Sequence, residues 1–286
     1  MADKIYILLP VHNRREITRR FIECLKVQSY RDYHLVLIDD GCIDGTQEMV
    51  RNDINDLTVI KGKGDWWWTG SLKQAYAWLK AGDFPVNDIV LIINDDTIFE
   101  NNFLETAVSI LSRQAKTLLQ AQCYGWKSKQ LIDSGVCVDW KRLTFEQAVT
   151  PDQINCLSTR GLFMRMGDFL FIRGFHSRLL PHYASDYEFT MRARRKGMKL
   201  MTHPSLKLWV NECTTGYHQL DISDTFCASL KKLFSKKTQI NPVIWTSFIL
   251  LSCPWSLKTI NIVRIWIEIA KMVLRKTESR HEWKKQ

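Results

Sequence analysis

Short apolar runs and amphipathic stretches alternate along the first 120 residues of the chain. An apolar run over 4–10 is followed by a stretch over 14–28 in which Ile17, Phe21, Ile22 and Leu25 recur at helical spacing. The same alternation continues with apolar runs at 34–40, 57–61, 89–93 and 117–123, and with helical patterns at 44–52, 71–81 and 102–114. Strands that alternate with helices in this way predict an α/β protein with a mainly parallel sheet, flanked by helices on both faces.

Polar segments directly follow four of the predicted strands. They lie at 10–13, 39–40, 62–70 and 94–96. In an open α/β sheet, ligands bind at the carboxyl ends of the parallel strands, because these ends share one edge. We therefore expect the four polar segments to converge on a single site.

The segment Asn94-Asp95-Asp96 ends an apolar run that is rich in β-branched residues. Adjacent carboxylates repel unless a cation lies between them, and a divalent ion that carries a diphosphate would be such a cation. The alternative is a strand-to-helix turn whose polar side chains cap the next helix. This segment alone leaves both interpretations open.

The pattern weakens over 124–159 and returns at 161–175, before a helix that is expected over 186–196 and ends at Gly197. Arg192 and Arg195 lie on this helix, where the spread of charge favours a solvated face over a phosphate site. We expect the weakly patterned segment to be an insertion in the second half of the domain.

Composition narrows the class of protein. With 286 residues and 45% hydrophobic content, the chain can bury a large core. No run of about 18 apolar residues predicts a spanning helix, and the opening residues do not resemble a secretory signal. The eight cysteines lack C-x-x-C spacing, which is typical of a reducing compartment. A cytoplasmic protein is therefore expected.

The net charge of +10 is concentrated near the C-terminus. Residues 220–286 hold twelve Lys and Arg against five Asp and Glu, a net charge of +7 that leaves +3 for residues 1–219. No nucleic-acid-binding motif accompanies this charge, so no nucleic-acid partner is expected.

An amphipathic helix is predicted over 257–276. One face carries Ile260, Val263, Ile267, Ala270 and Leu274, and the opposite stripe carries Lys258, Arg264, Glu268, Lys271 and Arg275. Such a helix can lie in an anionic membrane interface, which predicts peripheral attachment to the inner face of the cell membrane through 220–286. The alternative is a helical pair that packs on the domain or on a second subunit.

Five ordered motifs resemble those of the inverting glycosyltransferases of family 2, which have the Rossmann-like GT-A fold. The motifs are LLPVHNR at 8–14, LIDDGCIDGT at 37–46, the glycine-rich loop at 62–71, INDD at 93–96 and SDYEFTMRARRKG at 185–197. The resemblance, which is to the bacterial polysaccharide-biosynthesis type, covers about residues 4–215. It implies a GT-A domain over 1–219, with a nucleotide-sugar-binding half at 1–116 and an acceptor-binding half at 117–219. A basic amphipathic helical extension over 220–286 follows.

The resemblance also implies the reaction and its central residues. A sugar would move from a UDP or dTDP donor to a glycan or polyprenyl-linked acceptor, with Asp186 as the base that takes the acceptor proton. Asp96 would bind Mg²⁺ or Mn²⁺ between the two phosphates, and His218 would be a further metal ligand. Asp95 would support the turn, and Asn94, which departs from the more usual Asp, would lie near the ribose or a metal-bound water.

The remaining residues implied by the resemblance surround the donor. Asp40 would accept a hydrogen bond from the N3 proton of uracil or thymine. The other donor contacts would come from Pro10, His12, Asn13, Asp65, Trp68, Gly70 and Ser71. For at least two of the three tryptophans at 66–68, core packing is an equally good interpretation.

Two rival functions are weighed against this one. A sugar-1-phosphate nucleotidyltransferase normally has a glycine-rich phosphate loop after its first strand, which PVHNRRE lacks. A non-catalytic sugar-binding or membrane-binding module would bind a nucleotide sugar without turnover. The sequence also leaves a homo-oligomer open.

Overall fold

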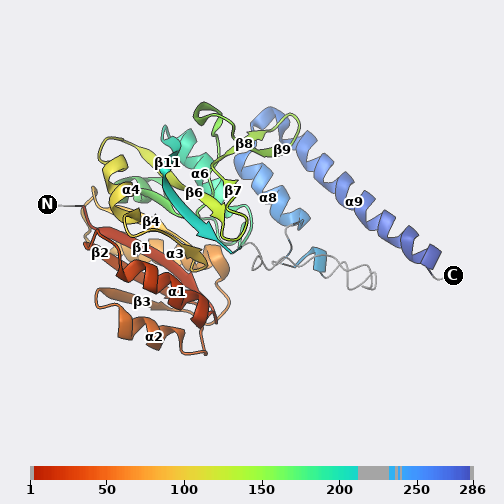
Figure 1. The fold of residues 1–286 in the computed structure, drawn as a ribbon. Coiled ribbons are helices and arrows are strands. Elements are labelled where there is room, and N and C mark those ends of the chain that lie inside the picture. The colour runs from red at the N-terminus through yellow and green to blue at the C-terminus, as the bar shows by residue number, and fades with distance from the viewer. Residues whose placement is uncertain (1–2, 212–231, 236–237, 239, 284–286) are drawn as a thin grey trace.

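The computed structural model describes residues 3–211, 232–235, 238 and 240–283, with side chains up to residue 272 (Figure 1). Its centre is a nine-stranded sheet in the order β3-β2-β1-β4-β10-β6-β11-β5, with β7 paired to β6. The first four strands are parallel and form the N-terminal half of the sheet: β1 Ile5–Val11, β2 Tyr33–Asp39, β3 Leu57–Lys61 and β4 Ile89–Ile92. The predicted α/β class with a mainly parallel sheet is confirmed.

Alternating residues of β1 pack in two hydrophobic layers, one on each face of the sheet. Ile5, Ile7 and Leu9 point to one layer, which is covered by α1 (Arg15–Lys26), α2 (Thr46–Asp53) and α4 (Phe103–Leu111). Tyr6 and Leu8 point to the other, which is covered by α3 (Trp67–Ala81), α5 (Met166–Ile172) and α6 (Ser185–Arg195). Successive residues of a strand point to opposite faces, and here both faces are buried. The strands are therefore continuous apolar runs in the sequence.

The second half of the sheet is mixed. Its strands are β5 Thr97–Ile98, β6 Thr117–Gly125, β7 Leu131–Asp133, β10 Leu162–Arg165 and β11 Lys199–Val210. Strand β10 is antiparallel to both β4 and β6, so β6 runs in the direction of β4 and its carboxyl end reaches the same edge. The chain after Asp96 therefore returns to the edge where the first four strands end.

The weakly patterned segment 124–159 contains β7, a separate hairpin and a short 3₁₀ turn. The hairpin consists of β8 (Val136–Asp139) and β9 (Thr144–Gln147), and the turn spans Pro151–Gln153. These strands are only three or four residues long, which explains why no clear period marks them in the sequence.

The C-terminal helices differ in how they pack. Helix α8 (Pro242–Ser252) buries Ile244 and Phe248 in a small cluster with the β8–β9 hairpin and α6. It therefore packs on the domain, as the alternative interpretation of this region proposed. Helix α9 (Lys258–Trp283) starts against α8 and then projects away from the sheet (Figure 1). In the described part of the chain, no helix combines the length and apolarity that crossing a membrane requires.

Candidate active site

A cavity of about 370 Å³ lies at the carboxyl ends of β1, β2 and β4, against the first turn of α3. Seven residues predicted to contact the donor line it: Pro10, His12, Asp40, Trp68, Ser71, Asn94 and Asp95. Three more residues of the lining, Arg14, Trp67 and His182, had no predicted role. The polar segments therefore converge at one edge of the sheet, as predicted, and this edge is formed by the carboxyl ends of the parallel strands.

Asp40 anchors the glycine-rich loop. Its buried carboxylate accepts the backbone N–H of Gly64 at 2.8 Å, of Trp66 at 2.9 Å and of Trp67 at 3.1 Å. The last two donors belong to the start of α3, so Asp40 caps a helix that is distant in sequence. A Cβ on Gly62 would lie 2.5 Å from Oδ1 of Asp40, which explains why glycine is needed there.

His12 and Asn13 hold the turn after β1 against the turn after β2. Nδ1 of His12 lies 2.6 Å from the backbone oxygen of Asp40, so Nδ1 donates a hydrogen bond to this oxygen. In a neutral imidazole, Nε2 is then a hydrogen-bond acceptor. Asn13 accepts the N–H of Ile43 at 2.9 Å and has a left-handed φ of 50°. Both residues are exposed, but only His12 lines the cavity, and Asn13 lies outside its lining.

Arg14 lies between the two adjacent carboxylates of the Asn-Asp-Asp segment. Its guanidinium is 2.9 Å from Oδ1 of Asp95 and 3.1 Å from Oδ2 of Asp96. The other oxygen of Asp95 accepts the hydroxyl of Thr18 at 2.9 Å, so each oxygen of buried Asp95 has a partner. Burial raises the pKa of Asp95 to about 6, while Arg14 acts in the opposite direction and Asp96 adds to the rise. The cation that the sequence requires here is supplied, at least in part, by the chain itself.

Asn94 and Asp96 have oxygens that fit a divalent ion. Oδ1 of Asn94 is buried at the cavity and has no hydrogen-bond partner among the described residues. Asp96 is 23% exposed, and only Oδ2 is engaged within the described part. No cluster of three His, Cys, Asp or Glu side chains occurs in the described residues. A pair of oxygen ligands nevertheless suits Mg²⁺ or Mn²⁺, because such ions take further ligands from phosphates and water. His218 lies outside the described residues.

Asp186 occupies the first turn of α6, a helix that begins directly after Ala184, a non-glycine residue in the left-handed region. Its Oδ1 accepts the backbone N–H of Tyr187 at 2.9 Å. Burial raises the pKa of Asp186 to about 6, although this N–H and the charge of Arg160 act in the opposite direction. A carboxyl with this pKa is mostly ionised at neutral pH and can accept a proton.

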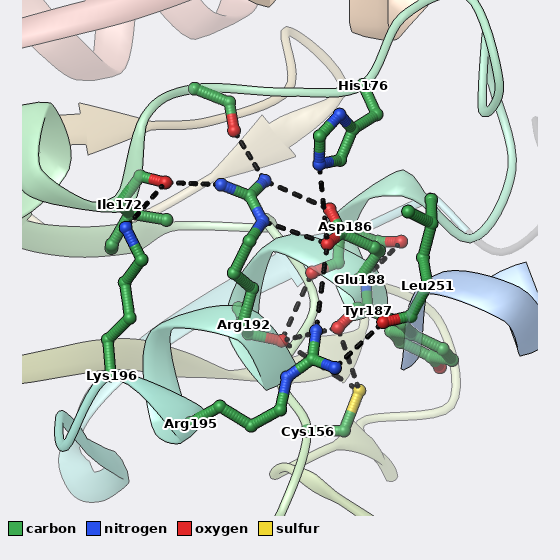
Figure 2. A network of polar contacts seen from close by, with 12 residues as sticks. Cys156, Ile172, His176, Asp186, Tyr187, Glu188, Arg192, Arg195, Lys196 and Leu251 are labelled. Carbon is green, nitrogen blue, oxygen red and sulfur yellow. Dashed lines mark hydrogen bonds and ion pairs between the residues drawn. The ribbon is translucent and has the colours of Figure 1, made fainter. Parts of the chain in front are cut away.

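Glu188, two residues further on, is held in an ion-pair network (Figure 2). Arg192 donates from Nε to Oε1 at 2.8 Å and from Nη2 to Oε2 at 2.9 Å, and Glu188 is buried. Arg192 also donates to the backbone oxygens of Ile172 and Gly174, beyond the end of α5. Arg192 therefore does not lie on a solvated face, and that expectation was wrong. Arg195 is half-exposed and donates to the backbone oxygen of Leu251 at 2.8 Å.

Arg160 is a second cation that sequence reasoning missed. Burial disfavours its charge, yet nearby Cys123, Asp133, Asp96 and Asp186 raise its pKa overall. Arg160 is thus close enough to act electrostatically on both the predicted metal ligand and the predicted base. The signal in the sequence was weak, because Arg160 stands alone in the loop before β10 and belongs to no motif.

The three tryptophans at 66–68 take different positions. Trp66 and Trp68 pack against the core, and Trp68 also reaches the donor cavity. Trp67 has a φ of 57° and lies edge-on to His182, with the ring centroids 5.9 Å apart. A left-handed conformation of a bulky residue is costly and is often found at functional sites.

A second cavity borders the first at Trp67. It lies between the start of α3 and the loop at 177–181, and Asp65 and Gly70 line it. Neither of these two residues lines the first cavity, where the resemblance implied a contact with the donor. The structure therefore separates Asp65 and Gly70 from the other predicted donor residues.

Comparisons with known proteins were made for sequence and for structure. The sequence matches the family described as "Glycosyl transferase family 2" over residues 6–166. A comparison with curated proteins finds no match.

Solved glycosyltransferase structures resemble the fold at low sequence identity. S. aureus TarS 1-349 in complex with UDP-GlcNAc has a TM-score of 0.60 and 16% identity, with 90% of this chain and 69% of that chain covered. The mannosyltransferase PcManGT from Pyrobaculum calidifontis, in complex with GDP-Man and Mn²⁺, has a TM-score of 0.57 and 14% identity, with 99% and 81% covered. GalNAc-T7 with UDP, GalNAc and Mn²⁺ has a TM-score of 0.61 and 11% identity, with 86% and 49% covered. The chain spans 43% of the length of the longer S. aureus TarS structure. These likenesses establish the GT-A fold.

Proposed function

The chain belongs to glycosyltransferase family 2, and from this premise we propose that it is an inverting glycosyltransferase that uses a nucleoside-diphosphate sugar. The acceptor would be a glycan or a lipid-linked saccharide. The observation that carries the proposal is the shared edge of the sheet. Asp40, His12 and Asn94 line a cavity there, Asp96 follows two residues after Asn94 at the end of the same strand, and Asp96 and Asp186 both raise the pKa of Arg160.

The geometry of Asp40 supports a pyrimidine donor, UDP or dTDP. A carboxylate offers about four lone-pair positions, and three of them accept the loop amides. One position is left for the N3–H of uracil or thymine. TarS is bound to UDP-GlcNAc and PcManGT to GDP-Man, so a screen of donors should include UDP, dTDP and GDP sugars.

Transfer would proceed by a single displacement. The acceptor hydroxyl oxygen attacks C1 of the donor sugar from the face opposite the diphosphate, and its proton passes to the Asp186 carboxylate. The bond between C1 and the phosphate oxygen breaks, and the nucleoside diphosphate leaves with the electron pair. Inversion at C1 follows from this geometry.

Asn94 and Asp96 would hold Mg²⁺ or Mn²⁺ against the diphosphate. When bound, such an ion stabilises the negative charge that grows on the leaving group. Arg14, which lines the donor cavity, would also stabilise this charge, since its guanidinium already pairs with the Asp96 carboxylate.

Donor turnover in the presence and absence of Mn²⁺ tests the proposal. UDP, dTDP and GDP sugars are incubated with the full chain, and the free nucleoside diphosphate is quantified with and without glycan acceptors. We expect Asp96→Asn to weaken Mn²⁺ binding in a calorimetric titration and Asp186→Asn to lower transfer by about 10²- to 10⁴-fold. Asp152→Asn, on an exposed turn, is the matched control. Binding of a nucleotide sugar without any turnover would instead favour a non-catalytic module.

We also propose that α9 attaches the enzyme to an anionic membrane surface. Ile260, Val263 and Ile267, from the predicted apolar face, are exposed, and Trp255 just before the helix is 87% exposed. The opposite side is fixed to the domain, since Asn261 donates to the backbone oxygen of Trp140 at 2.8 Å. An exposed apolar stripe in a region with a net charge of +7 suits an interface with anionic lipids.

Sedimentation with vesicles tests the attachment. We expect binding to vesicles that contain phosphatidylglycerol, weaker binding to neutral phosphatidylcholine, and loss of binding in Val263→Glu/Ile267→Glu. Val149→Glu, at a position that is 87% exposed on the domain, is the control. If the double variant instead dissociates a dimer in analytical ultracentrifugation and vesicle binding is unchanged, the stripe is a subunit interface and the membrane proposal is wrong.

A further inference from the structure

Trp126 is a large aromatic side chain left exposed beside Asp96. It follows β6 directly, and its backbone N–H donates to the oxygen of Val210 at 2.8 Å. Val210 in turn pairs with Thr97, the residue after Asp96. These two backbone contacts therefore hold residue 126 close to residue 96, and both residues line one cavity. The Trp126 side chain is 44% exposed in this position.

A small cavity joins Trp126 to the reaction centre. Asp95, Asp96, Arg20 and Asn211 line it together with Trp126. Asp95 borders both this cavity and the donor cavity. A ligand held against Trp126 would thus lie next to the segment that is proposed to hold the diphosphate.

An exposed lysine side chain lies over the indole of Trp126, with Nζ of Lys129 4.2 Å from the ring centroid. A ligand can take this place, because a lysine has a flexible four-carbon stem. An aromatic face next to polar groups suits a pyranose, whose C–H face packs on the ring while its hydroxyls bind the polar groups. Lys129, Arg20 and Asp96 supply such groups around Trp126.

We propose that Trp126 is the stacking residue of the acceptor site and binds a saccharide ring of the acceptor. The inference rests on the proposed function and adds a place for the second substrate. Trp126 belongs to the half of the domain, 117–219, that is expected to bind the acceptor. The two other tryptophans with similar or greater exposure among the described residues, Trp255 and Trp266, lie in the C-terminal region and provide internal comparisons.

Fluorine NMR of the full chain labelled with 5-fluorotryptophan tests binding without need of the natural acceptor. The Trp126 resonance is assigned with Trp126→Phe, and the protein is titrated with the methyl glycosides of glucose, galactose, N-acetylglucosamine and N-acetylgalactosamine. We expect at least one glycoside to shift the Trp126 resonance and leave the Trp255 resonance in place. The proposal is overturned if none of the four shifts the Trp126 resonance, or if both resonances shift alike.

Kinetics with the glycoside that shifts the resonance give the second measurement. We expect Trp126→Ala to raise the acceptor KM by about 3- to 10-fold, the range that corresponds to one aromatic contact, and Trp126→Phe to retain most of the affinity. Trp255→Ala should resemble the parent throughout. Unchanged acceptor KM in Trp126→Ala would contradict the site. A parent enzyme that turns over no donor with any acceptor would contradict the proposed function instead.

Discussion

Replacing Asp40 by Asn should destabilise the protein even in the absence of any nucleotide. The carboxylate accepts three backbone N–H groups, from Gly64, Trp66 and Trp67, and all three distances are 3.1 Å or shorter. An amide keeps one acceptor oxygen but turns an NH₂ group toward the remaining donors. At least one amide proton of the loop then loses its partner, and the bonds that remain are no longer assisted by charge.

The size of the effect follows from these contacts. An unsatisfied buried donor costs about 1–3 kcal/mol, and a bond to a charged acceptor is roughly twice as strong as a neutral one. We therefore expect Asp40→Asn to lower the free energy of unfolding by about 2–4 kcal/mol. For a domain of this size, that corresponds to a fall in Tm of about 4–10 °C.

Thermal unfolding of the nucleotide-free protein, followed by circular dichroism, measures the change. Asp65→Asn is the matched control, because Asp65 lies in the same loop but its side chain is exposed. A Tm for Asp40→Asn within about 1 °C of that of Asp65→Asn would refute the reasoning, since Asp40 could not then anchor the loop. In that case, a lower donor affinity in Asp40→Asn would result only from the lost hydrogen bond to the uracil or thymine of the donor.

Three further predictions concern the carboxylates of the site and of α6. Because burial raises the pKa of Asp186 to about 6 and the base must be ionised, kcat/KM should fall about tenfold per pH unit below pH 6, as a pH–rate profile would show. The folded pKa of Asp186 is above the ordinary 3.8, so its contribution to stability is present below pH 3.8 and is lost as the pH rises through 6. At pH 8, the free energy of unfolding of Asp186→Asn, measured in urea, should therefore exceed that of the parent by up to about 3 kcal/mol. Transfer by the same variant should fall about 10²- to 10⁴-fold. Arg192→Met should cost about 3–5 kcal/mol in urea unfolding because it leaves buried Glu188 unpaired, whereas Arg195→Met, at a half-exposed position, should cost less than about 1 kcal/mol.

The N-terminal half of the fold could be predicted closely from the sequence. Strand β3 spans 57–61 as expected, and β1 and β2 differ from the expected bounds by one residue. This accuracy has a physical cause, because strands buried on both faces are continuous apolar runs that end where polar residues begin. Helix α3 was the exception, since it begins at Trp67 rather than near residue 71. Its first turn is capped from Asp40, and a cap that comes from another strand leaves no local signal.

The candidate site was predicted well where topology determines it and poorly where side chains choose their partners. Seven predicted donor residues share one cavity because the strand ends meet. Asp65 and Gly70 were expected beside them, but α3 turns these two residues toward a second cavity. Arg14 and Arg160 were missed for a similar reason, since the long side chain of an arginine can reach several neighbours and its sequence position does not say which one.

Whether a carboxylate can accept a proton or bind a metal ion depends on how many of its oxygens already have a partner within the fold. Both oxygens of Glu188 are bound by Arg192, and both oxygens of Asp95 are engaged, by Arg14 and Thr18. In Asp186 and Asp96, by contrast, only one oxygen of each has a partner in the described part of the chain. A group that accepts a proton or binds a metal ion needs a lone pair that is not committed to the fold. This criterion selects Asp186 over Glu188 within one helix, and Asp96 over Asp95 within one turn. Neither choice could be made from residue type alone, because each pair consists of neighbouring acids in the same motif.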